Sequence, residues 1–182
     1  MNEAKTIDEV LSQLDEIIEE TLHDNSYACV FAYVYRRTTA QIKEAILQGR
    51  FDDNERMEKM DVVFANFYIR AFYDYKNKLP VCNAWKAAFD NQHQPVTLIQ
   101  HLLLGMNAHI NYDLCQAAAQ VAQGGQIKEV ERDFMTVNQV LAELVDEMQL
   151  KLGTLSPLMI LLDWAGKRSD EQIVNFSMVK AR

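Results

Sequence analysis

Histidine, asparagine and aspartate side chains gather in one stretch of this chain, residues 100–117, which reads QHLLLGMNAHINYDLCQA. Histidines and carboxylates serve proteins as general bases, proton carriers and metal ligands. Here they are interspersed with leucine, methionine and alanine, which are typical of a buried helix. Any chemistry that the sequence offers is therefore expected in this stretch.

The spacing of these residues decides which of them can act together. His109 and Asp113 are four residues apart, so they are neighbours on one helix face, within reach of each other or of a common ion. His101 precedes His109 by eight residues, which is about 12 Å along a straight helix. Because ligands lie about 2 Å from a metal ion, the two histidines cannot coordinate the same ion. We expect His109 and Asp113 to point the same way, with His109 largely inside, at or beside a cleft.

On a helical wheel the stretch has one polar arc, and most of its remaining circumference is apolar. The arc holds His101, Gly105, His109, Tyr112 and Gln116, with Asp113 at its edge. Leu103, Met106, Ile110, Leu114 and Ala117 share one apolar side. Asn107 and Asn111 lie away from the arc, and a buried amide without a partner costs about 1–3 kcal/mol. These two amides are therefore predicted to bond a neighbouring group or a ligand.

Two functions follow from this cluster, and the residues leave both open. The first is a pocket for a small ligand or a single divalent metal ion. Its ligand-binding residues would be His101, Asn107, His109, Asn111 and Asp113, together with Asp61 from another helix. His109 and Asp113 would hold the metal, whereas no catalytic residue is assigned. The alternative is a non-enzymatic helical scaffold or interaction module, in which the cluster is a polar network that fixes helix register.

The elements that must position the cluster are predicted to be helices only. Six glycines and three prolines in 182 residues are few, and both residues disfavour helix interiors. We expect one domain over residues 1–182, a bundle of about seven helices with a central buried helix around 95–123. Residues 1–24 form an N-terminal helix that can pack as an appendage. A stripe predicted to face inward runs through Val130, Phe134, Val137, Leu141, Leu144 and Met148.

Composition excludes several classes of partner. Asp and Glu outnumber Lys and Arg by 26 to 18, which argues against nucleic acid and against anionic membranes. The chain has no apolar run of about 18 residues and no signal-peptide pattern at its start. Its three cysteines form no CxxC pair, which favours reduced thiols in a cytoplasmic protein. A small molecule is the expected partner, and the oligomeric state is left open.

Longer segments carry a resemblance to a known family. The segments are HLLLGMNAHINYDL, MDVVFANFYIRAF, NAWKAAF, DFMTVNQVLAELVDEMQ, SPLMILLD and FSMVKAR. With its G-M-N-A-H-I-N-x-D-L core, the chain resembles a bacterial family that carries a domain of unknown function, over most of its length from about Cys29 onward. The resemblance implies an α-helical domain and brings no established activity.

Other catalytic families are excluded by the residues that they require. The all-helical zinc-dependent phospholipase C and P1-nuclease family builds a trinuclear zinc site from many histidines, and this chain has four. A site with one metal ion is still compatible with that number. The phosphate-binding loop, the G-x-S-x-G nucleophile turn, the H-E-x-x-H zinc motif and the Glu-x-x-His pair of di-iron bundles do not occur.

Overall fold

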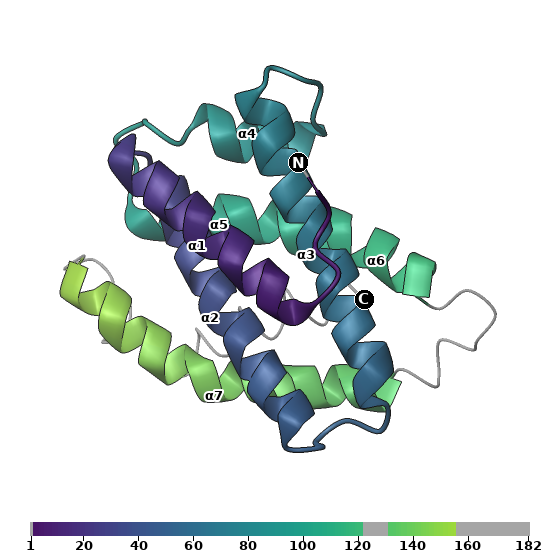
Figure 1. The fold of residues 1–182 in the computed structure, drawn as a ribbon. Coiled ribbons are helices and arrows are strands. Elements are labelled where there is room, and N and C mark those ends of the chain that lie inside the picture. Colours follow the sequence, from purple (N-terminus) through teal and green to yellow (C-terminus); the bar gives the residue numbers. More distant parts are fainter. Residues whose placement is uncertain (1, 122–130, 156–182) are drawn as a thin grey trace.

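The computed structural model describes residues 2–121 and 131–155, and throughout these ranges the regular structure is helical, as predicted. The elements are α1 (Ile7–His23), α2 (Ala28–Leu47), α3 (Asn54–Lys76), α4 (Asn83–Asp90), α5 (Leu98–Ala108), the π-helical turn η1 (His109–Asp113), α6 (Leu114–Val121) and α7 (Glu131–Leu155) (Figure 1). Because α5, η1 and α6 follow one another without a break, the described residues form six continuous helices.

Several predictions fall outside the part of the chain that the structure describes. They are the end of the central helix at Gly124–Gly125, the stripe residue Val130 and the helices expected after Ser156–Pro157 and Ser169. The side chain of Met148, also in the stripe, lies outside it as well.

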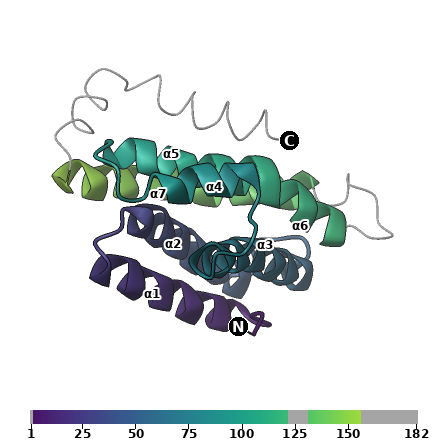
Figure 2. The same cartoon turned by 90° about the horizontal axis from the view of Figure 1, so that it is seen from above.

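The helices are arranged in three layers (Figure 2). One outer layer is α1, which packs on α2 and α3. These two helices form the middle layer, and the other side is covered by α4, α5, α6 and α7. Val10, Leu14 and Ile17 of α1 are fully buried and join the same core as α2 and α3. The polar stretch of the sequence therefore lies on a layer that packs directly against the core helices.

Polar side chains define where the helices begin. The Thr6 and Asp53 side chains accept the backbone N–H groups of Glu9 and Arg56 at the starts of α1 and α3. Thr97 and Gln100 form a reciprocal capping box at the start of α5. The central helix therefore begins at Leu98, three residues after Pro95.

The inward stripe of α7 contacts the rest of the bundle along its described part. Phe134, Val137 and Leu141 line an internal cavity, and Leu144 is buried. At the start of α7, the fully buried Asp133 carboxylate accepts hydrogen bonds from the backbone N–H of Asp52 and from Arg56, at 2.7 and 2.6 Å. These contacts hold α7 against the start of α3. Among the described residues, no helix is long and apolar enough to cross a membrane.

Candidate functional site

Most of the polar arc of the central helix faces the protein interior. His101, Gly105, His109 and Asp113 are buried, whereas Tyr112 of the arc is 44% exposed and Leu103 on the apolar side is 47% exposed. The expectation that His109 lies inside, next to Asp113, is confirmed. This inward face can carry an imidazole because aromatic residues of α2 and α3 pack against it. An imidazole ring is planar and stacks on these aromatic rings.

A π-helical turn lies in the middle of this helix, over His109–Asp113. The Leu114 N–H donates to the carbonyl of His109, five residues earlier. Such wider turns are rare and are frequently found at functional sites. Residues four apart already share a face of an α-helix, so the wider turn is not needed to bring His109 and Asp113 together. It instead shifts the positions after Asp113 relative to the α-helical wheel.

His109 and Asp113 form a closed network with a third residue, Trp85 of α4. The His109 Nδ1 lies 3.0 Å from Asp113 Oδ2. The Trp85 Nε1–H donates to both carboxylate oxygens, at 2.9 Å to Oδ2 and 3.2 Å to Oδ1. All three side chains are almost completely buried. Cys82 caps the short helix that carries Trp85, since its sulfur accepts the Trp85 backbone N–H.

An aromatic cage surrounds the His109 ring. The ring stacks on Phe64 with 3.6 Å between centroids and 8° between planes, and Tyr35 meets it edge-on at 4.3 Å. Burial lowers the pKa of His109, although the Asp113 carboxylate raises it in part. The imidazole is therefore neutral near pH 7. Its Nδ1–H donates to Asp113, which leaves Nε2 as a buried acceptor that has no partner among the described residues.

Gly105 lets the central helix approach α2. A Cβ atom at this position would lie 2.5 Å from Cγ of the Phe31 ring, and Phe31 is itself packed against Tyr35, Tyr68 and Trp85. Glycine is required here by this close approach to the Phe31 ring.

Replacing Gly105 by alanine is therefore expected to destabilise the protein. The methyl group must displace a ring that has no free space, which typically costs about 1–3 kcal/mol. The loss should exceed the gain of up to about 1 kcal/mol that alanine brings to a helix interior. Chemical denaturation measures the difference, and Asn107→Ala on the exposed face serves as control. A Gly105→Ala protein as stable as the wild type would contradict this packing.

A cavity of about 100 Å³ lies next to the cage, between α2, α3, α6, η1 and α7. Its lining is mostly apolar and includes Met57, Met60, Ile110, Leu114, Val137 and Leu141. Asp61 brings a carboxyl group to this lining, and one oxygen of that group is buried without a partner among the described residues. Burial, assisted by the charge of Glu58, raises the pKa of Asp61 to about 7.

Tyr35 connects the cavity with the polar network. It lines the cavity and also contacts the His109 ring. Its pKa is raised well above the usual value, first by burial and then by the charges of Asp61 and Asp113, so both carboxyl groups act on this phenol. Sequence reasoning named none of Tyr35, Phe64 and Trp85 as a site residue, and so it missed the part that they have in the site. A residue pattern gives no signal of which aromatic side chain meets a carboxylate across helices.

The other predicted site residues lie apart from this network. His101 is buried and stacks on Tyr27, with 4.5 Å between ring centroids. Asn107 and Asn111 are exposed, and Asn111 Nδ2 donates to Asn107 Oδ1 at 2.8 Å. The prediction that these amides are buried is thus wrong, because the helix turns this side towards solvent. Each amide nevertheless has a partner, which is the other amide.

The described residues also offer few ligands to a metal ion. No group of three or more histidine, cysteine, aspartate or glutamate side chains converges in this part of the chain. His109 and Asp113 would supply two ligands. They bond each other, and both Asp113 oxygens accept from Trp85.

The fold and the site define an all-helical bundle protein whose core contains a histidine–aspartate–tryptophan network beside a small apolar cavity. The chain belongs to a family of unknown function (DUF5995), which it matches over residues 7–182. This agrees with the resemblance drawn from the sequence. Neither a curated protein nor a solved structure matches the chain significantly.

Proposed function

We propose that the protein binds a small, largely apolar molecule in the cavity lined by Tyr35, Asp61 and Phe64. The observation that carries this proposal is the combination of an apolar lining with a buried carboxyl oxygen of Asp61 that has no partner among the described residues. Ligand sites typically combine apolar walls with a few polar groups that orient the ligand. An unpaired buried polar group costs about 1–3 kcal/mol, and a ligand that bonds it recovers part of that cost.

The size and charge of the cavity restrict the ligand. About 100 Å³ is somewhat smaller than the engineered cavity of about 150 Å³ that accepts benzene. A single ring or a short chain with one hydroxyl or amide group therefore matches it. Because the pKa of Asp61 is about 7, its carboxyl group is largely neutral in mildly acidic solution and can donate or accept a hydrogen bond.

In this proposal the His109–Asp113 pair supports the cavity and does not contact the ligand. The pair orients the imidazole, the imidazole stacks on Phe64, and Phe64 forms part of the cavity wall. The proposal needs no metal ion. A cytoplasmic location is also part of this proposal. It agrees with the three cysteines, which form no disulfide.

Binding can be tested with phenol and benzene as probes and methionine methyl groups as reporters. We expect both probes to shift the methyl resonances of Met57 and Met60 in a saturable way at pH 6, because these residues line the cavity. Phenol should bind about fivefold more tightly than benzene, since one net hydrogen bond contributes about 1 kcal/mol. The exposed Met135 is the internal control.

Two variants make this experiment specific. Val137→Phe places a ring in the cavity and should abolish binding of both probes. Asp61→Leu keeps the approximate volume and should remove the preference for phenol while benzene still binds. Circular dichroism confirms that each variant is folded. The proposal fails if neither probe gives saturable shifts in the wild type, or if the shifts persist in Val137→Phe.

The scaffold alternative is supported by one observation, the closed hydrogen bonding of His109, Asp113 and Trp85. It expects that the cavity binds neither probe and that the network serves stability alone. The methyl experiment therefore separates the two functions.

A further inference from the structure

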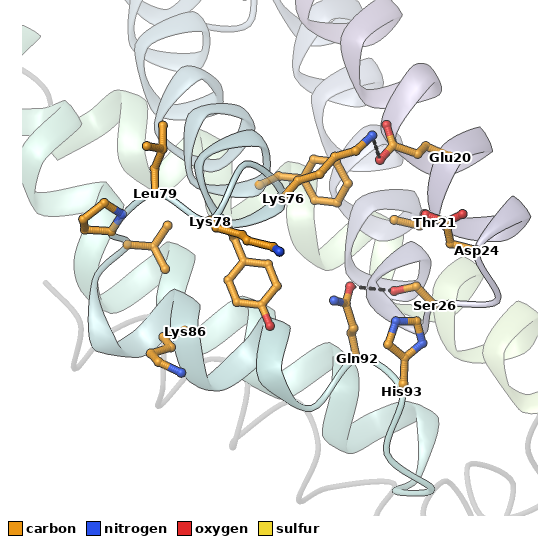
Figure 3. A pocket seen from close by; sticks show the side chains of 14 residues that line it. Glu20, Thr21, Asp24, Ser26, Lys76, Lys78, Leu79, Lys86, Gln92 and His93 are labelled. Carbon is orange, nitrogen blue, oxygen red and sulfur yellow. Dashed lines mark hydrogen bonds and ion pairs between the residues drawn. The ribbon is translucent and has the colours of Figure 1, made fainter.

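A second cavity, of about 580 Å³, opens at the C-terminal end of α3 (Figure 3). This is the opposite end of α3 from the one that the start of α7 contacts. The cavity lies where α1 and α3 end, and it is completed by the connection to α4, by α4 itself and by Gln92 and His93. This volume is within the usual range for small-molecule sites, about 300–1,000 Å³. None of the residues predicted from the sequence as a site lies in its lining.

The lining combines an apolar surface with hydrogen-bond donors. Phe72, Leu79, Pro80 and Val81 supply apolar surface. Gln92 Oε1 accepts a hydrogen bond from the Ser26 hydroxyl at 2.8 Å (Figure 3). The Gln92 amide nitrogen, which also borders the cavity, donates to no other side chain in the part of the chain that the structure describes. A ligand here meets hydrocarbon on one side and N–H groups on the other.

Three lysines also line the cavity, and they differ in their partners. Lys76 forms an ion pair with Glu20, and Lys86 forms one with Asp90. Lys78 forms no ion pair with any described residue. In Figure 3 its side chain extends into the space between Lys76 and Gln92. The Lys78 ammonium group therefore borders the cavity and forms no ion pair with another described residue.

The backbone of Lys78 belongs to the turn that ends α3. Lys78 follows the C-terminus of α3 and has φ of +59°. This left-handed position is usually taken by glycine, or by asparagine, because a Cβ atom is disfavoured there. A lysine here has an energetic cost, and the hydrogen bonds that end the helix hold it in this conformation: the Lys78 N–H donates to the Tyr75 carbonyl and the Leu79 N–H to the Asp74 carbonyl.

We propose that this cavity binds a small organic carboxylate with an apolar body, whose carboxylate pairs with Lys78 and accepts from the Gln92 amide. The apolar body would lie against Phe72, Pro80 and Val81. Three lysines and two carboxylates, Glu20 and Asp24, line the cavity, so its net positive charge suits a ligand with one negative charge, and the apolar surface requires more than an inorganic anion. The site is separate from the Asp61 cavity and is independent of the function proposed for it.

Isothermal titration calorimetry with 2-naphthoate tests this assignment, with 2-naphthalenemethanol as its neutral counterpart and inorganic phosphate as a plain anion. We expect 2-naphthoate to bind about fivefold more tightly than the alcohol, because an exposed ion pair contributes up to about 1 kcal/mol. High salt should reduce this difference. Phosphate should bind more weakly than either compound.

Matched variants show whether Lys78 is responsible. Lys78→Gln should remove the preference for 2-naphthoate, whereas Lys59→Gln, on the same helix about 25 Å before Lys76, should retain it. Lys78→Gly relieves the left-handed backbone, so it should keep or raise the melting temperature while losing the preference. Val137→Phe should leave 2-naphthoate binding unchanged. Undiminished preference in Lys78→Gln, phosphate binding as tight as that of 2-naphthoate, or no binding of 2-naphthoate would overturn the proposal.

Discussion

Replacing Asp113 by asparagine is expected to lower the free energy of unfolding by about 2–4 kcal/mol. Both oxygens of the carboxylate lie within 3.2 Å of the Trp85 Nε1, at 2.9 and 3.2 Å. An asparagine removes the charge and places an NH₂ group within 3.2 Å of the Trp85 Nε1 in either orientation of the amide. With the amide oxygen in the Oδ2 position, Trp85 and His109 both keep an acceptor, but hydrogen bonds to an uncharged oxygen are weaker than those to a carboxylate, and the NH₂ group still faces a donor.

Urea denaturation of the Asp113→Asn protein measures this loss, and Glu19→Gln is the matched control because Glu19 is an exposed carboxylate on α1. The control should change stability by less than about 0.5 kcal/mol. Trp85→Phe removes the opposing donor, so the double variant Trp85→Phe with Asp113→Asn should lose less than the sum of the single variants. Unchanged stability of Asp113→Asn would show that water reaches the pair, and that the network is not a closed structural one.

The buried carboxyl group of Asp61 is expected to make stability fall as the pH rises from about 5 to 8. Its pKa is about 7 in the folded protein and 3.8 when exposed. The folded state therefore holds the proton more tightly than the unfolded state. The stability that this provides is fully present below the unfolded pKa and is lost as the pH rises through the folded pKa. At 1.36 kcal/mol for each pKa unit, about 2–3 kcal/mol should be lost between pH 5 and 8.

Asp61→Asn should remove this dependence, because an amide resembles the protonated acid and does not titrate. The informative quantity is the stability difference between wild type and variant at pH 5 and at pH 8, which cancels the contribution of His109 and other groups. The stability of the Asp61→Asn variant should increase relative to that of the wild type as the pH rises. Glu58→Gln removes the charge that assists the shift and should reduce the slope slightly. Parallel stability curves for wild type and Asp61→Asn would contradict the burial of a neutral acid.

Local sequence patterns predicted the helices and their starts well, because these depend on groups close in the chain. The N-terminal helix predicted within residues 1–24 is α1, and the Thr6 side chain caps its start. The spacing of His109 and Asp113 predicted that they meet, and they do at 3.0 Å. The π-helical turn was not foreseen. A wheel built on the α-helical period therefore described the second half of the central helix less well than the first.

The orientation of the central helix was not predictable in the same way. Its wheel suggested that Asn107 and Asn111 are buried, whereas both are exposed and the His101, His109 and Asp113 side chains are buried. Which face turns inward depends on what the neighbouring helices present. Here Phe31, Tyr35 and Phe64 present rings, onto which the His109 ring packs.

The sequence by itself determined that this chain forms helices, where most of them begin, and that His109 and Asp113 share one face. These properties follow from capping groups, from the scarcity of glycine and proline, and from the helical period. Only the tertiary structure decided that Trp85 completes the pair, that Asp61 opens onto an apolar cavity, and that Lys78 lines a second cavity without an ion pair to any other described residue. Each of these depends on contacts between helices distant in the chain, because burial and side-chain distances arise only when the layers pack together.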